Sequence, residues 1–247
     1  MRLIALYAGV LLALTQPAPV ITVHLAGDST MADRPSPERN PYRGWGQLLS
    51  RFFDDSVVVH NHAVNGRSTK SFIDEGKWAA LMAEVHAGDY VIVQFGHNDE
   101  KREDSTRYTD PDGAYRANLR HFVTDVRAAG ATPILCTSIA RRAFDATGTL
   151  RMTHGAYPRA TRVVAAEMRV TLLDMERSTM ALVSAAGPDS SKRLFGWVAP
   201  GTNAMYPDGL HDDTHLSVEG AAAVARLAAH ELRDSGLPLA RHVREDR

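Results

Sequence analysis

Five short segments of the chain combine apolar and β-branched residues in the way that is typical of strands. The segment at 89–95 is apolar on both faces, as strands inside a parallel sheet are. The predicted strands span residues 20–26, 56–60, 89–95, 132–139 and 170–175. The first of them ends at Gly27, a residue that commonly terminates a strand.

Between these strands the apolar positions follow the spacing of amphipathic helices. In one of them the apolar stripe consists of Tyr115, Leu119, Phe122, Val123 and Val126. Gly130 then ends this helix, and Ser217 is a good N-cap for the last one. The other predicted helices span residues 44–53, 72–85, 156–168 and 178–186, whereas 187–210, rich in proline and glycine, is predicted to be irregular. Such alternation predicts an α/β fold with a parallel sheet between two helical layers.

The N-terminal segment has a different pattern. Arg2 precedes an apolar run of about a dozen residues, the usual length of the hydrophobic region of a signal peptide. The run is shorter than the ~20 residues that span a bilayer. We therefore expect a signal peptide at 1–19, a folded domain at 20–247, and a secreted or periplasmic protein that keeps no membrane anchor after cleavage. The alternative is a buried N-terminal helix.

The composition is that of an ordinary globular protein. The chain has 247 residues, a formal net charge of −1 and 44% hydrophobic residues, which excludes a disordered chain and leaves no basic excess for binding nucleic acid. Cys136 is the single cysteine, so an intramolecular disulfide and a cysteine-based zinc cluster are excluded. Because Cys136 lies inside a predicted strand, we expect it to pack in the core, as we do for Trp45 and Trp78.

Residues that could take part in catalysis follow three of the predicted strands. Ser29 follows the first strand, Gly66 the second and Asn98 the third, and active sites of open α/β sheets lie beyond the carboxyl ends of strands. Before the last helix, Asp212 stands three residues from His215. A carboxylate at that spacing can accept from the imidazole Nδ1–H and leave Nε2 to face a nucleophile.

Six segments, in this order, carry a family resemblance. They read GDST at 27–30, NGRSTKSF at 65–72, EGKW at 75–78, FGHND at 95–99, THGAYP at 153–158 and DDTH at 212–215. Together they resemble the SGNH (GDSL-like) hydrolases, and within them the bacterial rhamnogalacturonan acetylesterases, over about residues 21–232. The resemblance implies a flavodoxin-like three-layer α/β/α sandwich with a mainly parallel five-stranded sheet.

The same resemblance implies roles for individual residues. Ser29 is then the nucleophile, His215 the general base and Asp212 the residue that orients it. The oxyanion hole consists of the backbone N–H groups of Ser29 and Gly66 and the side-chain amide of Asn98. The expected protein is a secreted serine esterase that removes acetyl groups from plant cell-wall polysaccharide, acts as a monomer, and needs no metal or cofactor.

Four further residues are candidates for contact with the substrate. Arg67 can bind a carboxylated sugar, and Trp197 and Tyr206 can stack on sugar rings. The alternative for Trp197 is a position in the core. His97 is expected to order the Asn98 loop or to contact the substrate rather than to transfer a proton. His60 and His62 are interpreted as structural residues near a strand end.

Other interpretations remain open from the sequence. His211, Asp212, Asp213 and His215 can be read as a metal-binding cluster, although Ser29, Gly66 and Asn98 would then have no role. In the esterase interpretation, Asp213 is expected to face solvent or to cap the turn before the last helix. The substrate can also be another acetylated glycan or a small ester, and the chain can also be a non-catalytic carbohydrate-binding protein on a hydrolase scaffold.

Overall fold

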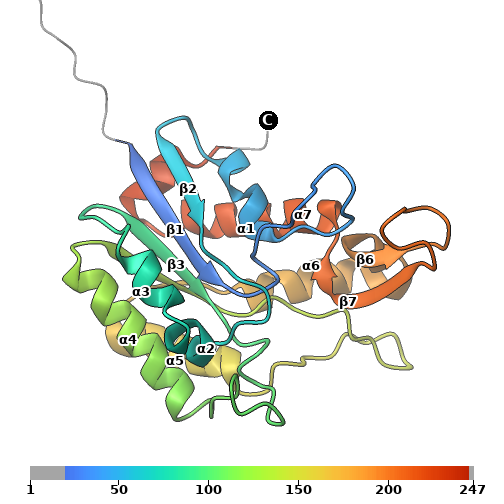
Figure 1. Ribbon diagram of the computed structural model, residues 1–247, viewed down its shortest axis with the longest axis horizontal. Coiled ribbons are helices and arrows are strands. Elements are labelled where there is room, and N and C mark those ends of the chain that lie inside the picture. The colour runs from blue at the N-terminus through green and yellow to red at the C-terminus, as the bar shows by residue number, and fades with distance from the viewer. Residues whose placement is uncertain (1–19, 245–247) are drawn as a thin grey trace, which may run out of the picture.

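A computed structural model describes residues 20–244 and confirms the α/β sandwich (Figure 1). All pairings in the five-stranded sheet are parallel, and the strand order is β2-β1-β3-β4-β5. The strands are β1 (Ile21–Gly27), β2 (Val57–Asn61), β3 (Tyr90–Gln94), β4 (Thr132–Cys136) and β5 (Thr171–Leu173). The signal peptide predicted at 1–19 lies outside the described residues. Within the described residues, no helix has the length and apolar character needed to cross a membrane.

Helices cover both faces of the sheet (Figure 1). On one face lie α1 (Trp45–Leu48), α6 (Met175–Ser190) and α7 (Val218–Arg233). On the other face lie α2 (Thr69–Asp74), α3 (Lys77–Met82), α4 (Ala114–Ala128) and α5 (Tyr157–Met168). Short 3₁₀ turns occupy Leu49–Phe52, Ser191–Leu194 and Pro238–His242. Each face therefore has its own apolar core, with the sheet between them.

The predicted core residues lie in these two cores. Trp45 is fully buried on the α7 face, and Trp78 is buried on the α4 face. Cys136 is buried, as expected, although it is the last residue of β4 and not an interior one. All five residues of the predicted α4 stripe are buried, and burial of each such side chain stabilises the fold by about 1.5–3 kcal/mol. Gly130, at φ +74°, follows the helix in the left-handed conformation that ends it.

The prediction of one helix at 72–85 is wrong, because two short helices, α2 and α3, occupy this part of the chain. Ser68 and Ser71 form a reciprocal capping box that begins α2 before residue 72. Gly76 adopts φ +71° between α2 and α3, a left-handed conformation that interrupts a helix.

The irregular region predicted at 187–210 is also only partly irregular. It contains the end of α6, where Gly187 adopts φ +72°, and the strand β6 (Phe195–Val198). This strand pairs antiparallel with β7 (Leu210–Leu216), which forms a two-stranded sheet beside the main one (Figure 1). The segment of Asp212 and His215 therefore lies in a strand. Ser217 caps α7 as predicted, since its side chain accepts from the Gly220 N–H at 3.0 Å.

The strand order explains where the chemistry gathers. From β1 the chain goes to β2 on one side, and then crosses to β3 on the other side of β1. The carboxyl ends of β1 and β3 are therefore neighbours at the point where the winding reverses, with Gly27 in register with Gln94. Sheets of this type bind ligands at that crevice. Ser29 and Asn98 follow these two strands directly.

Candidate active site

The turn after β1 presents Ser29 at the edge of the sheet. The carbonyl of Asp28 accepts hydrogen bonds from the N–H groups of Met31 and Ala32, at 3.1 and 3.0 Å. Asp28 Oδ1 also accepts from the N–H and the hydroxyl of Thr30, at 2.9 and 2.8 Å. Asp28 and Thr30 are buried, whereas Ser29 between them is partly exposed. The turn thus fixes the backbone of Ser29 and leaves its side chain free to react.

Buried polar groups support this turn from below. Gln94, the last residue of β3, donates from Nε2 to Thr30 Oγ1 at 2.8 Å. Its Oε1 accepts from Trp45 Nε1 at 3.0 Å. Arg34 adds a contact from the side, because its Nη2 donates to the Ser29 carbonyl at 2.7 Å. The position of Ser29 is therefore tied to β3, to α1 and to the loop between β1 and α1.

The structure brings His215 to Ser29 across 186 positions of the sequence. Nε2 of His215 lies 2.9 Å from Ser29 Oγ, and Nδ1 lies 2.7 Å from Asp212 Oδ2. A carboxylate accepts only, so Nδ1 carries the hydrogen, and Nε2 of the neutral ring is left to accept from the Ser29 hydroxyl. A hydroxyl, an imidazole and a carboxylate that contact one another in this order are the groups needed to activate an oxygen nucleophile.

Asp212 is held by four hydrogen bonds. Oδ1 accepts from the backbone N–H groups of Thr214 and His215, at 2.8 and 2.9 Å. Oδ2 accepts from His215 Nδ1 and from the hydroxyl of Tyr42, the latter at 2.9 Å. Burial raises the pKa of the Asp212 carboxyl, but the hydrogen bonds from His215 and Thr214 outweigh it and hold that pKa well below its ordinary value. Asp212 is therefore ionised at neutral pH and can stabilise a protonated imidazole.

Sequence reasoning missed Tyr42, because its partner Asp212 is 170 positions away. Tyr42 packs edge-on against His215, with ring centroids 5.7 Å apart. Gly196 in β6 makes room for it, since a Cβ at that position would lie 2.2 Å from the Tyr42 ring. The one signal in the sequence is this glycine inside a strand, which often marks the close approach of another group.

The loop after β2 carries Gly66 and is tied to the end of β1. The N–H of Val64 donates to the Gly27 carbonyl at 3.0 Å, and the N–H of His62 donates to the Leu25 carbonyl at 2.9 Å. Gly66 itself adopts φ +75°, a backbone conformation that favours glycine. Within residues 20–244, neither the Gly66 N–H nor the Ser29 N–H donates to a protein acceptor. Both remain available to an external oxygen.

Asn98 and Asp99 join this loop to the end of β3. Asn98 Nδ2 donates to the Arg67 carbonyl at 3.1 Å, which leaves its second N–H for another acceptor. The next residue, Asp99, is fully buried, and its Oδ1 accepts from the N–H and the hydroxyl of Thr69, at 3.0 and 2.5 Å. It also accepts from the hydroxyl of Thr109 at 2.8 Å. The Gly66 and Asn98 loops are thus held in one arrangement.

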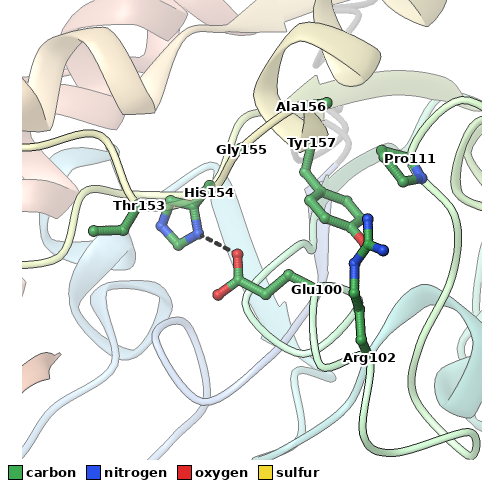
Figure 2. Close-up of a pocket in the computed structure, with 8 residues that line it drawn as sticks. All are labelled: Glu100, Arg102, Pro111, Thr153, His154, Gly155, Ala156 and Tyr157. Atoms are coloured by element: carbon green, nitrogen blue, oxygen red, sulfur yellow. Dashed lines mark hydrogen bonds and ion pairs between the residues drawn. The ribbon is translucent and has the colours of Figure 1, made fainter.

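The segment at 153–158 supports the Asn98 loop. A hollow of about 420 Å³ is lined by Glu100, Arg102, Pro111 and residues 153–157. Figure 2 shows these residues. His154 faces Glu100, with Nδ1 3.1 Å from Oε2. The Tyr157 hydroxyl lies 2.9 Å from the Asp99 carbonyl oxygen. The segment at 153–158, which is one of the six that carry the family resemblance, therefore holds the loop of Asn98 in place.

The structure corrects the expectation that His97 contacts the substrate. Its side chain is only 3% exposed and packs against His154, with ring centroids 4.3 Å apart. Nδ1 lies 3.4 Å from Asp28 Oδ2. Burial, with a contribution from His154, lowers the pKa of His97 to about 4, so the ring is neutral at neutral pH. A ring enclosed in this way orders the turns at Asp28 and Asn98, which is the other role that the sequence suggested.

Trp197 is not a free stacking platform. Its indole stacks on His211 with centroids 4.3 Å apart, and the cationic ends of Arg142 and Lys192 each lie 5.0 Å from its ring. Its Nε1 donates to Asp213 Oδ1 at 2.8 Å. Protein groups thus occupy the surroundings in which a sugar was expected to stack.

Tyr206 and Arg67 remain at the surface of the site. Tyr206 contacts the Tyr42 ring edge-on, at 5.9 Å between centroids. The Tyr42 ring in turn contacts His215, so Tyr42 lies between Tyr206 and His215. Arg67 pairs with Glu75 at 2.9 Å and lines a hollow of about 230 Å³ together with Gly66 and Arg107. This hollow adjoins the N–H that the resemblance assigns to the oxyanion hole.

The alternative metal cluster does not converge. Asp212 and His215 bond to one another, whereas His211 stacks on Trp197. Asp213 is exposed, as expected, but it does not cap the turn before α7: its Oδ1 pairs with Arg142 Nη1 at 2.9 Å. The four side chains therefore serve different partners.

Comparisons with known proteins identify the family and the fold. Residues 25–223 match the model of the GDSL-like Lipase/Acylhydrolase family. The rhamnogalacturonan acetylesterase RhgT of Bacillus subtilis is 43% identical over 223 residues, which cover 90% of this chain and 94% of that protein. The crystal structure of YxiM from Bacillus subtilis superposes with a TM-score of 0.75 and 26% identity over 90% of this chain, which spans 59% of YxiM. An acetylxylan esterase from Geobacillus stearothermophilus, Axe2, shares the fold with a TM-score of 0.60 at 17% identity, over 93% of this chain and 98% of that one.

Asp99 makes the stability of the fold dependent on pH. Burial raises the pKa of Asp99 from its ordinary value of 3.8 to about 7. A raised pKa means that the contribution of this group to the free energy of unfolding is fully present below the ordinary value and is lost as the pH rises through about 7. Asp99→Asn keeps an acceptor oxygen but cannot ionise. We therefore expect the melting temperature of the wild type to fall from about pH 5 to about pH 8 relative to that of Asp99→Asn.

Thermal melts of both proteins across this range measure the effect. Asp104→Asn is the matched control. Asp104 is partly exposed, and its hydrogen bond from Thr106 lowers its pKa to about 2, so this carboxyl does not titrate between pH 5 and pH 8. Melting curves of wild type and Asp99→Asn that shift in parallel with pH would contradict the assignment.

Proposed function

This chain belongs to the GDSL-like lipase/acylhydrolase family and is a carboxylic ester hydrolase, and we propose that it removes acetyl groups from an acetylated plant polysaccharide by using Ser29, His215 and Asp212. One observation carries the proposal: a continuous chain of contacts runs from Ser29 Oγ through His215 to Asp212, at 2.9 and 2.7 Å.

In the proposed first step, Ser29 Oγ attacks the acetyl carbonyl carbon while His215 Nε2 takes the hydroxyl proton. The ionised Asp212 stabilises the imidazolium that forms. Collapse of the tetrahedral intermediate breaks the bond to the sugar oxygen, and His215 returns the proton to that oxygen. The products of this step are the free sugar hydroxyl and an acetylated Ser29.

The oxyanion of the tetrahedral intermediate needs hydrogen-bond donors that are already in place. The Ser29 and Gly66 N–H groups donate to no protein acceptor within residues 20–244, and Asn98 has one N–H to spare. Because these donors are anchored by Asp28 and Asp99, they need little rearrangement when the charge develops. We propose that they form the oxyanion hole.

In the second step, a water molecule replaces the sugar oxygen. His215 takes a proton from this water, which attacks the acetyl carbon. Acetic acid then leaves from Ser29 Oγ as His215 returns the proton to the serine, and it ionises to acetate in solution. The same donors stabilise the second oxyanion. The cycle therefore uses one base twice and restores the starting state.

For the substrate we propose acetylated rhamnogalacturonan, a polymer with carboxylate groups. The support is the 43% identity to RhgT, named a rhamnogalacturonan acetylesterase, and the hollow beside Gly66 that presents two guanidinium groups. Arg67 and Arg107 each form an ion pair there, with Glu75 and Asp104, and each keeps further N–H donors for a sugar carboxylate. We also propose export from the cytoplasm, which rests on the signal-like sequence at 1–19.

Acetate release from three substrates tests the proposed function. The substrates are a chromogenic acetate ester, acetylated rhamnogalacturonan and the neutral polymer acetylxylan. We expect the highest kcat/KM for rhamnogalacturonan. Ser29→Ala should lower kcat on all of them by several orders of magnitude. Arg107→Gln should raise KM for rhamnogalacturonan alone, and Arg120→Gln, which disrupts an exposed ion pair between α4 and α5, is the matched control.

The outcomes of this comparison are distinguishable. A preference for acetylxylan would replace the proposed glycan, and hydrolysis of the small ester alone would point to a small-ester esterase. Binding of a polysaccharide without any acetate release would mean a carbohydrate-binding protein. Full activity of Ser29→Ala would overturn the assignment of the nucleophile.

Asp212 and Asp213 are adjacent but differ in their partners, which makes them a matched pair. Asp212 accepts from His215 Nδ1, whereas Asp213 binds Arg142 and Trp197. We expect Asp212→Asn to lower kcat by ~10³–10⁴, because the amide favours the wrong imidazole tautomer. Asp213→Asn should cost less than about tenfold. Steady-state kinetics on the chromogenic ester measure both, and the reverse ranking would show that the orienting carboxylate is misassigned.

Tyr42 is a positioning residue for Asp212. Tyr42→Phe keeps the ring under Gly196 but removes the hydroxyl donor, so Asp212 attracts the protonated imidazole more strongly. We expect kcat to fall by about tenfold with little change in KM, and the acid limb of kcat/KM to move to higher pH. Tyr206→Phe is the control, since Tyr206 touches the Tyr42 ring but not Asp212. A Tyr42→Phe profile that overlays the wild type would refute this role.

A further inference from the structure

Three histidines outside the proposed active site gather at the edge of the sheet. His24 lies in β1 and His60 in β2, where the two are paired in register. His62 is two residues after His60, so it points to the same face of the sheet. One ligand atom from each of His24, His60 and His62 lies within 4.8 Å of the other two, and within residues 20–244 these three are the one such group.

We propose that His24, His60 and His62 bind a divalent transition-metal ion of the Zn²⁺ class, which holds β2 to β1. Imidazole nitrogens are the preferred neutral ligands of Zn²⁺, Ni²⁺ and Cu²⁺, and three of them meet the minimum for a stable protein site. The expected role is structural, because the proposed chemistry at Ser29 uses protein groups alone.

The spacing of the nitrogens suits such an ion. With metal–nitrogen bonds of ~2.0–2.1 Å, ligand atoms around a tetrahedral ion lie ~3.3 Å apart. His24 Nδ1 and His62 Nε2 are already 3.1 Å apart. His60 is the more distant ligand, and its half-exposed ring can turn toward the other two without disturbing the core. On binding an ion, His24 and His62 would exchange their mutual hydrogen bond for bonds to the ion, and the exposed His60 would turn toward them.

Asp89 orients the buried ligand. His24 is 1% exposed, and its Nε2 lies 3.3 Å from Asp89 Oδ2. Since the carboxylate can only accept, Nε2 carries the hydrogen and Nδ1 presents its lone pair to His62. Asp89 is itself fixed by the N–H of His86, which donates to Oδ2 at 2.7 Å. A carboxylate behind a histidine in this way sets the tautomer and raises the basicity of a metal ligand.

Glu84 supplies a negative charge on the solvent side. Its Oε2 lies 3.7 Å from His60 Nδ1 and 4.0 Å from His62 Nε2. A carboxylate oxygen at that point can complete a tetrahedral set of three nitrogens and one oxygen. Together, the buried Asp89 and the exposed Glu84 also balance the charge of a divalent ion.

Binding of Zn²⁺ to the untagged full chain tests the proposal. Competition with a chromophoric chelator should give one equivalent bound, and Zn²⁺ should raise the melting temperature. Co²⁺ in its place should give the intense visible bands of a tetrahedral site. His60→Ala, whose side chain is half-exposed, should lower the affinity at least tenfold, and Asp89→Asn by ~10–100-fold.

The control separates this site from other surface histidines. His121→Ala removes a half-exposed histidine that pairs with Asp125 on α4, and it should bind Zn²⁺ as the wild type does. Hydrolysis of the chromogenic ester by the metal-free protein should retain kcat. Absence of stoichiometric binding in the micromolar range, or equal affinities of His60→Ala and wild type, would overturn the proposal and leave the three histidines as a hydrogen-bonded cluster.

Discussion

Hydrogen bonds to three aspartates hold the proposed active site together, because a carboxyl group removed from water is costly unless hydrogen bonds compensate for the loss. These residues are Asp28, Asp99 and Asp212. The first follows β1 and fixes the turn of Ser29 through Thr30. The second follows β3 and ties the Asn98 loop to the loop of Gly66 through Thr69. The third lies in β7 and fixes both the backbone and the ring of His215. Each reactive group thus lies within three positions of a carboxylate that organises its segment.

The topology of the sheet makes these three arrangements meet. The winding reverses at β1, so the loops after β1, β2 and β3 open into one crevice. The last segment arrives differently, from the antiparallel pair β6 and β7 beside the main sheet (Figure 1). This small sheet also carries Gly196, whose missing side chain admits Tyr42 to Asp212. The base is therefore placed by contacts that lie outside the repeating strand–helix pattern.

That difference explains what could be predicted from the sequence. Strands, α4 and its end at Gly130 follow from local periodicity, and Ser29, Asn98 and the Asp212–His215 spacing follow from their places at strand ends or before a helix. Tyr42 could not be found in this way, because its role depends on a contact over 170 positions. The strand β6 is four residues long and has too few positions to show a period. The burial of His97 depends on His154, which comes from a distant loop.

The same edge of the sheet links the histidine cluster to the proposed oxyanion hole. Beyond Asn61 the chain leaves β2 and is attached to β1 by two backbone hydrogen bonds, from His62 to Leu25 and from Val64 to Gly27. Gly66 follows two residues later. β2 is an edge strand with one neighbour, so its end has fewer hydrogen bonds than that of β3. An ion between β1 and β2 would add a link at the end of this edge strand, whereas the Gly66 loop is already held by the hydrogen bonds of Val64 to Gly27 and of Asn98 to Arg67, so the reacting atoms do not depend on the ion.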